Sequence, residues 1–276
     1  MTGARITRTY GHAMNDRYGI RADYISRSEP EYFDDTAREY DGLVWQPDVY
    51  RHAAAFADRL GAGSIIDIGP GSGDKLNAIA GRRHAIGLDF GANLQTCASR
   101  YPHREWRELD IDNDAALPVT VDELTGAVIV CADVIEHLVR PERLMALLAD
   151  ALAHASVAVL STPDRVRLAG PRHLGPPRNP HHVREWTRDE LAAFLRIAGF
   201  EHAVVRYTRE NNMRPDFRTI EAVIGRDAMV LERIGLPCSG VMTADGADAP
   251  VIDRFVGLGR GVRYAVRVLP RRLRGR

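Results

Sequence analysis

The segment Asp67-Ile68-Gly69-Pro70-Gly71-Ser72-Gly73 connects an apolar run at 64–69 to a stretch with helical character, Asp74–Ala80. A strand that leads straight into closely spaced glycines and then a helix brings backbone N–H groups near a ligand. The glycines are spaced two and two, whereas the dinucleotide pattern G-x-G-x-x-G needs a third glycine where this chain has Asp74. The segment therefore predicts a nucleoside-binding turn and disfavours a pyrophosphate ligand.

Strand-like and helix-like segments alternate on both sides of this turn. Pro47 suits the first position of a helix that Gly61 ends. Thr187 and Glu190 form a capping box that opens a helix closed by Gly199. The other expected helices cover 74–80, 93–101 and 140–154, and the expected strands cover 64–69, 84–89, 106–110, 127–132, 157–161, 203–207 and 219–224.

This alternation predicts an α/β fold with parallel strands and helices on both faces of the sheet. The last two strands are joined too closely for an intervening helix, so one of them should be antiparallel. We expect a doubly wound, mostly parallel, seven-stranded sheet with a terminal antiparallel strand. The predicted organisation is an N-terminal cap at 1–45, a main domain at 46–225 and a C-terminal extension at 226–276.

The composition is that of an ordinary folded protein, with 45% hydrophobic and 27% charged residues. Lys+Arg and Asp+Glu both total 37, so net charge provides no general attraction to nucleic acid or a membrane surface. The beginning of the chain lacks the apolar stretch of a signal peptide, and no apolar run is long enough to span a bilayer.

Cys97, Cys131 and Cys238 are far apart and odd in number, which disfavours a disulfide framework and predicts a cytoplasmic location. The end of the chain is locally basic, and such a tail either contacts phosphate groups or is a solvated terminus. Its arginines are at positions 260, 263, 267, 271, 272, 274 and 276.

Two further acids close the strands expected next to the glycine turn. Asp89 ends the second strand, where a carboxylate can accept hydrogen bonds from both ribose hydroxyls of an adenosine. Asp110 ends the third strand and is placed to accept from an adenine amino group, with Ile111 packing on the ring. Glycine turn and acids together predict an adenosine site at the carboxyl edge of the sheet.

These motifs resemble those of class I S-adenosylmethionine (SAM) dependent methyltransferases: DIGPGSG at 67–73, LD at 88–89 and CADVIEHL at 131–138. The segments STPDR, HVREWTRDEL and NNMRPDFRTIEAVIG resemble the subgroup that contains ubiquinone-pathway, sugar and natural-product O-methyltransferases. The resemblance covers about 60–225 and implies SAM as cofactor and the same seven-stranded sheet. The cofactor-binding residues expected from turn, acids and resemblance are Asp67, Gly69, Gly71, Gly73, Asp89, Asp110, Ile111 and Cys131.

A cluster of acids and histidines is expected beside the methyl donor. Asp133, Glu136 and His137 are spaced i, i+3, i+4, so one helical turn would face them together. His182 comes from a loop expected to fold over the same mouth. Two carboxylates and two imidazoles suit Mg²⁺, Mn²⁺ or Zn²⁺, which would lower the pKa of a substrate hydroxyl and hold it in line for transfer.

DVIEHL and HHVREWTR also resemble the small-RNA terminal 2′-O-methyltransferases, in which a Glu-x-x-Glu-His segment and a later His hold a metal. That resemblance implies Asp133, Glu136, His137 and His182 as the ligands, with Asp in place of the first Glu. Two other interpretations stay open. His137 or His182 could act as a general base without metal, or Glu136 and His137 could be polar residues that fix the start of a helix.

The leading functional hypothesis is O-methylation of a small polar acceptor, such as a sugar, a glycan or a secondary metabolite, with His137, His182 and Glu136 as catalytic residues. The neutral net charge and the N-terminal cap favour it over the rival, metal-dependent RNA 2′-O-methylation. A third hypothesis is a SAM-binding regulatory protein that transfers no methyl group. Self-association of the chain is left open.

Overall fold

The computed structural model describes residues 14–31 and 42–244. An eight-stranded sheet with the order β10-β8-β9-β7-β6-β3-β4-β5 forms its centre, and a separate two-stranded hairpin consists of β1 (Met14–Asn15) and β2 (Ile20–Arg21). The strands of the large sheet are β3 (Ser64–Ile68), β4 (His84–Asp89), β5 (Glu105–Glu108), β6 (Val128–Ala132), β7 (Val157–Pro163), β8 (Ala203–Thr208), β9 (Thr219–Gly225) and β10 (Val241–Thr243).

β9 lies between β7 and β8 and runs antiparallel to both, while the other pairs of neighbouring strands are parallel. The predicted doubly wound α/β fold is therefore confirmed, with each of the seven expected strands present. β10 adds an eighth, parallel strand at the edge beside β8. It is only three residues long, and such a short polar-flanked segment has no alternation that would reveal it.

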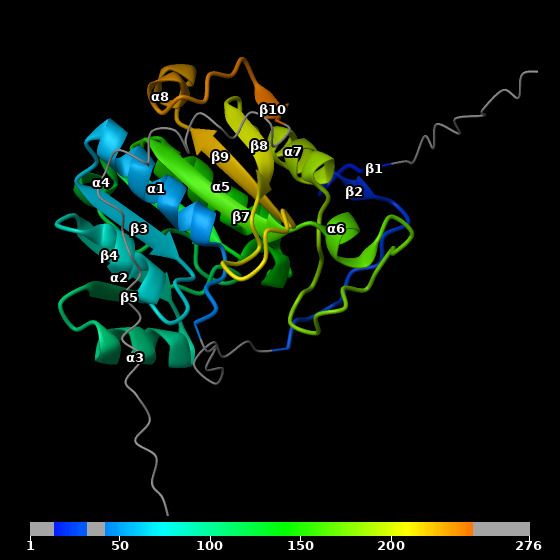
Figure 1. The fold of residues 1–276 in the computed structure, drawn as a ribbon, viewed down its shortest axis with the longest axis horizontal. Coiled ribbons are helices and arrows are strands. Elements are labelled where there is room, and N and C mark those ends of the chain that lie inside the picture. The colour runs from blue at the N-terminus through cyan, green and yellow to red at the C-terminus, as the bar shows by residue number, and fades with distance from the viewer. Residues whose placement is uncertain (1–13, 32–41, 245–276) are drawn as a thin grey trace, which may run out of the picture.

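Helices cover both faces of the sheet (Figure 1). One core cluster unites the helices α1, α2 and α8 with one side of the strands, and a second unites α5 and α7 with the other side. The helices are α1 (Pro47–Leu60), α2 (Asp74–Ala80), α3 (Gly91–Arg100), α4 (Val121–Leu124), α5 (Pro141–Leu152), α6 (Arg165–Ala169), α7 (Arg188–Ile197) and α8 (Ala228–Arg233).

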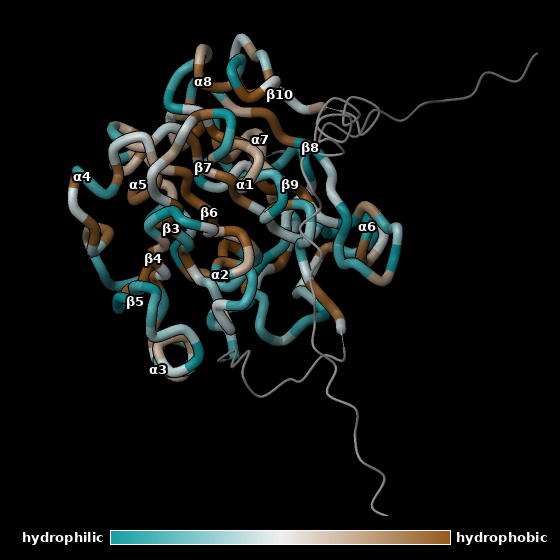
Figure 2. Tube along the Cα trace, turned by 60° about the vertical axis from the view of Figure 1, so that its left-hand side comes forward, coloured by the Kyte–Doolittle hydropathy of each residue, from teal (hydrophilic) through white to brown (hydrophobic). Residues whose placement is uncertain are grey.

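The central strands are apolar because both of their faces are covered. Every residue of β6 is buried, with Ile129 and Cys131 in one cluster and Val128 and Val130 in the other. Figure 2 shows the hydrophobic colour concentrated on the strands at the centre of the molecule and the hydrophilic colour on the surrounding loops.

The boundary signals in the sequence act as predicted. Pro47 occupies the first turn of α1, and Gly61 ends it with a left-handed backbone, φ 67°. Thr187 and Glu190 form the reciprocal capping box of α7. These local contacts fix where each helix begins and ends, and hence which strand ends lie at the same edge of the sheet.

The segments flanking the main domain pack on it where they are described. Ile20 belongs to the core cluster that contains α7, and the backbone N–H of Arg27 donates to the carbonyl of Val183 at 2.8 Å. Beyond position 225, Val230 and Leu231 of α8 are buried against the sheet. The packed body therefore extends to β10.

The arginine-rich tail at 260–276 lies outside the described residues, as do residues 1–13 and 32–41 of the predicted N-terminal cap. Within the described ranges, no helix is both long enough and apolar enough to cross a membrane.

Candidate functional site

The glycine turn follows β3 directly, at the carboxyl edge of the sheet. Gly69, Gly71 and Gly73 have φ values of 73°, 58° and 76°, a left-handed backbone that favours glycine. A Cβ on Gly69 would lie 2.4 Å from Cγ2 of Val134. The turn thus needs glycine both for its backbone and for close contact with the loop that follows β6.

Asp89 lies beside this turn as predicted. Its carboxylate is 7% exposed and accepts hydrogen bonds from the backbone N–H of Gly71 at 3.3 Å and of Phe90 at 2.8 Å. Asp74, at the position that excludes the dinucleotide pattern, instead faces outward and pairs with Arg100 and Tyr101. The acid at the end of β4 is therefore fixed against the turn, where an adenosine ribose is expected.

Asp110 and Ile111 belong to a tight loop after β5. The carboxylate of Asp110 accepts from the backbone N–H of Asp112 at 3.1 Å and from the side-chain amide of Asn113 at 2.7 Å. Ile111 is 8% exposed and packs in the core cluster, as does Cys131, which is 1% exposed. The roles of all three toward a cofactor remain predictions.

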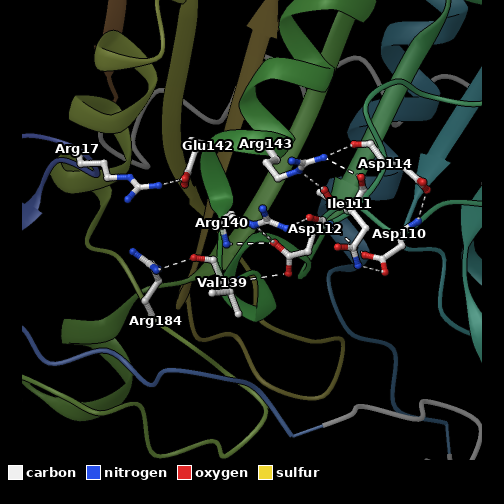
Figure 3. Close-up of polar contacts among 11 residues, drawn as sticks. Arg17, Asp110, Ile111, Asp112, Asp114, Val139, Arg140, Glu142, Arg143 and Arg184 are labelled. Carbon is white, nitrogen blue, oxygen red and sulfur yellow. Dashed lines mark hydrogen bonds and ion pairs between the residues drawn. The ribbon is translucent and has the colours of Figure 1, made fainter.

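Two arginines from the start of α5 hold this loop (Figure 3). The guanidinium of Arg143 donates to the carbonyls of Ile111, Asn113 and Asp114 at 3.2, 2.9 and 2.8 Å. The backbone N–H of Arg140 donates to the Asp112 carboxylate at 3.1 Å, and its guanidinium donates to the Asp112 carbonyl. The position of the expected adenine loop is therefore set by the helix that follows β6.

Asp67 lies beneath the glycine turn and is fully buried. The hydroxyl of Tyr50, on α1, donates to its carboxylate at 3.0 Å, and the Lys75 ammonium lies 4.7 Å from the centroid of the Tyr50 ring. Burial raises the pKa of Asp67 to about 7, although Lys75 and the Tyr50 hydroxyl act in the opposite direction. A buried acid at this place suits a cationic ligand better than a phosphate.

Contrary to the prediction, Asp133 does not share one helical turn with Glu136 and His137, although after burial its charge is the next cause that raises the pKa of Glu136. Its backbone is left-handed, φ 56°, and the short 3₁₀ turn begins only afterwards, over Ile135–His137. The side-chain amide of Gln46 donates to both oxygens of its carboxylate, at 2.9 and 2.7 Å. The expectation of a single helical turn was wrong, because Asp133 has a left-handed backbone and the turn begins only at Ile135.

Glu136, His137 and His182 do come together. One ligand atom from each lies within 4.8 Å of the other two, a group that does not include Asp133. Nδ1 of His137 contacts the carbonyl of His181 at 2.8 Å, and Nδ1 of His182 contacts the Glu185 carboxylate at 2.8 Å. With protons on both Nδ1 atoms, Nε2 is the atom of each ring that would bind a metal, the arrangement common among metal-binding histidines.

These three residues fit a divalent cation. Burial and the neighbouring His182 lower the pKa of His137 to about 4, so the ring is neutral, the form that binds metal. Glu136 is 1% exposed, and its carboxylate accepts from the Thr162 hydroxyl at 3.0 Å. Nε2 of His182 contacts the Asn179 amide at 2.9 Å, a contact that a bound ion would replace.

Several residues of this region were not predicted from the sequence. Gln46 is the N-cap residue of α1 and Tyr50 lies on its first turn, and Glu185 and Thr162 contact the side chains of His182 and Glu136. Lys75 could have been singled out from the sequence, because it is the only lysine among the 37 Lys and Arg residues. The other residues have no local sequence signal, because their partners come from distant parts of the chain.

The residues around the glycine turn also fit SAM. The turn offers close backbone approach, Asp89 would supply acceptors for ribose hydroxyls, and Asp67 is a buried acid directly before the turn. SAM carries an ammonium and a sulfonium and no phosphate, so the buried acid favours it over a dinucleotide.

Known proteins match this chain in sequence over the same region. The family model described as "Methyltransferase domain" matches residues 45–205. A relative from Mycolicibacterium smegmatis, described as a probable S-adenosylmethionine-dependent methyltransferase, is 32% identical over 156 residues, which are 55% of this chain and 58% of the relative. The match thus spans little more than half of that relative's length.

Two solved structures are similar at low identity. The N-terminal domain of EvdMO1 with SAH bound has a TM-score of 0.45 and 22% identity, covering 66% of this chain and 82% of that one. The small RNA methyltransferase HEN1 has a TM-score of 0.48 and 18% identity, covering 69% of this chain and 27% of that one.

Proposed function

Since this chain belongs to the family of methyltransferase-domain proteins, we propose that it transfers the methyl group of SAM to a hydroxyl of a small polar acceptor, a sugar, glycan or secondary metabolite. The observation that carries the proposal is the buried group of Glu136, His137 and His182. It lies after β6, next to the glycine turn that is proposed to hold the methyl donor.

In this proposal Glu136, His137 and His182 hold a divalent cation. A cation bound there would lower the pKa of the acceptor hydroxyl. Glu185 and the carbonyl of His181 keep the two imidazoles oriented through their Nδ1 atoms. The glycine turn and Asp89 fix the donor, so that the chain's contribution is mainly the relative placement of donor and acceptor.

Direct proton removal by a histidine is the weaker mechanism. His182 has the arrangement of a general base, with the Glu185 carboxylate on its Nδ1, but its Nε2 already contacts the Asn179 amide. The convergence of Glu136 and both imidazoles on one point favours a metal-ligand set.

The flanking segments fit a supporting role. We propose that residues 14–31 cover the acceptor side, because they contact the loop that carries His182: the backbone N–H of Arg27 donates to the carbonyl of Val183. Cys97, Cys131 and Cys238 are free thiols, which supports a reducing, cytoplasmic location.

A screen of SAM consumption tests this function. The purified protein is incubated with SAM and with sugars, phenols or short RNAs, and SAH formation is measured with and without EDTA and with Mg²⁺, Mn²⁺ or Zn²⁺ restored. Turnover with a small hydroxylated acceptor that EDTA abolishes supports the proposal. Turnover confined to RNA and falling steeply with salt would favour RNA 2′-O-methylation, and SAH binding without turnover would favour a regulatory SAM-binding protein.

A further inference from the structure

Gln46 and Asp133 share an unusual backbone. They are the two non-glycine residues in the described ranges with a left-handed conformation, φ 54° and 56°, which a side chain disfavours. Their side chains are joined by two hydrogen bonds from the Gln46 amide nitrogen. The carboxamide of Gln46 is therefore held in one orientation.

The other end of that carboxamide has no partner. Gln46 is 2% exposed, yet its Oε1 accepts no hydrogen bond from any described residue. A buried acceptor without a donor is costly and uncommon in folded proteins. Its position thus calls for a donor that is not part of the described chain.

Tyr50 lies one turn further along α1, on the same side of the helix as Gln46. Its hydroxyl binds the buried Asp67, and its ring supports the ammonium of Lys75. Lys75 forms no salt bridge with a described residue, although its charge acts on the pKa of Asp67. Tyr50 therefore contacts both a buried acid and an ammonium.

Gln46, Tyr50 and Asp67 meet at the point where the order of strands in the sheet reverses. β3 pairs with β4 on one side and with β6 on the other, and α1 reaches Asp67 at the end of β3 and Asp133 just after β6. Ligands of open α/β sheets bind at such a point. Acceptor oxygens together with one ammonium form the complement of a zwitterionic α-amino acid group.

We propose that Gln46 and Lys75 recognise the amino-acid end of SAM, with Oε1 of Gln46 accepting from the α-ammonium and Lys75 pairing with the α-carboxylate. The inference rests on the proposed function in that SAM is the ligand. Both residues lie outside the glycine turn and are specificity-determining rather than catalytic. Asp67 is buried nearby, and a bound ammonium would favour its charged form.

Two nucleosides separate this role from general damage to the site. SAH has the amino-acid group, whereas 5′-methylthioadenosine has the same adenosine and thioether without it. Titration calorimetry of Gln46→Gly and Lys75→Met should show SAH binding weakened about tenfold or more and methylthioadenosine binding within about twofold of wild type. Glycine suits the left-handed backbone at position 46, so the first variant removes the carboxamide without adding strain.

Two further variants serve as controls. Lys75→Arg keeps the charge and should retain most of the affinity for SAH. Arg100→Met removes a positive charge near the same helix, where Arg100 pairs with the outward-facing Asp74, and should leave SAH binding unchanged. Equal losses for both nucleosides, or an SAH affinity unchanged in the Gln46 and Lys75 variants, would overturn the inference.

Since Lys75 is the only lysine, its accessibility can be measured directly. Acetylation by an N-hydroxysuccinimide ester, followed by peptide mass spectrometry, should be slowed at Lys75 by saturating SAH and not by saturating methylthioadenosine. Equal protection by both nucleosides contradicts the proposal. Failure of the wild type to bind either nucleoside would refute the proposed function, and this inference with it, whereas normal SAH binding with no protection overturns the inference alone.

Discussion

The rings of His137 and His182 meet edge to face, with centroids 5.0 Å apart and planes at 90°. Each ring is oriented through Nδ1, one by a backbone carbonyl and the other by the Glu185 carboxylate. The two imidazoles come from different loops and converge on Glu136. The two imidazoles and Glu136 therefore fix the geometry of the proposed acceptor site.

Replacing either histidine should separate transfer from donor binding. His137→Ala or His182→Ala is expected to reduce methyl transfer by about 10²-fold or more, while SAH affinity stays within about twofold, because neither ring belongs to the glycine turn. Single-turnover kinetics and calorimetry measure the two quantities. His103→Ala, at an exposed histidine bonded to Asn77, is the matched control, and a large loss of SAH affinity in the two site variants would contradict the assignment.

Glu185→Gln tests the orienting role of the carboxylate on His182. The variant keeps the shape of the side chain and loses the charge that holds the Nδ1 proton, so metal affinity and activity should fall by about 10–100-fold. Metal binding is measured by competition with a chromogenic chelator. An unchanged affinity for every divalent ion tested would show that Glu185 has only a structural role.

Asp89→Ala should weaken SAH binding by on the order of 2–4 kcal/mol, from the loss of charge-assisted hydrogen bonds. The carboxylate also receives the N–H of Gly71, so part of the loss reflects a less ordered turn. Asp110→Ala is the variant for comparison, because the carboxylate of Asp110 already accepts two hydrogen bonds within its own loop. Normal SAH binding by Asp89→Ala would refute the placement of the ribose.

Gly69→Ala should abolish cofactor binding through contact with Val134. The added Cβ would lie 2.4 Å from Cγ2 of Val134, and the backbone has φ +73°. Val134→Ala removes the contact with Cγ2 but leaves the backbone strain of an alanine at positive φ. The double variant Gly69→Ala/Val134→Ala should therefore recover part of the SAH affinity. Thermal shift with and without SAH measures it; no recovery at all would mean that backbone strain alone accounts for the defect.

A buried network outside the site predicts a pH dependence of stability. Burial by itself would raise the pKa of Glu221, but the charges of Arg206 and His52 and their hydrogen bonds hold it at about 2. The folded-state pKa of Glu221 lies below the ordinary value of 4.5. Its ionised carboxylate therefore stabilises the fold at pH values above about 4.5. This contribution, on the order of 3 kcal/mol, disappears as the pH falls from about 4.5 toward 2.

Glu221→Gln removes this contribution. The difference in unfolding free energy between wild type and variant should therefore be largest near neutral pH and shrink as the pH is lowered below about 4.5. Urea titrations at about pH 7 and about pH 3 measure it. A difference that stays constant with pH would contradict the assignment of the low pKa to Glu221.

The fold could be predicted because its signals are local. Asp74–Ala80 and His84–Asp89 have the predicted bounds, since glycine and the change from period two to helical spacing mark their ends. The sites of Asp89 and of the Glu136, His137 and His182 group follow from the rule that strand ends meet at one edge.

The rest depends on contacts between distant parts of the chain. The carboxylate of Asp133 is held by Gln46, a residue whose own sequence context indicates only the start of a helix. Asp133 therefore looked like a fourth ligand by spacing, and its left-handed backbone could not be anticipated. Tyr50 and Lys75 likewise meet only when α1 and α2 pack together.

The segment from the 3₁₀ turn to the start of α5 serves both ends of the site. Glu136 and His137 stand at its beginning, and Arg140 and Arg143 grip the loop of Asp110 a few residues later. One short stretch of backbone thus fixes the distance between the reacting end of the proposed donor and its adenine end. A substitution that shifts this stretch would displace the residues at both ends, so donor affinity and transfer rate should change together across homologues that differ here.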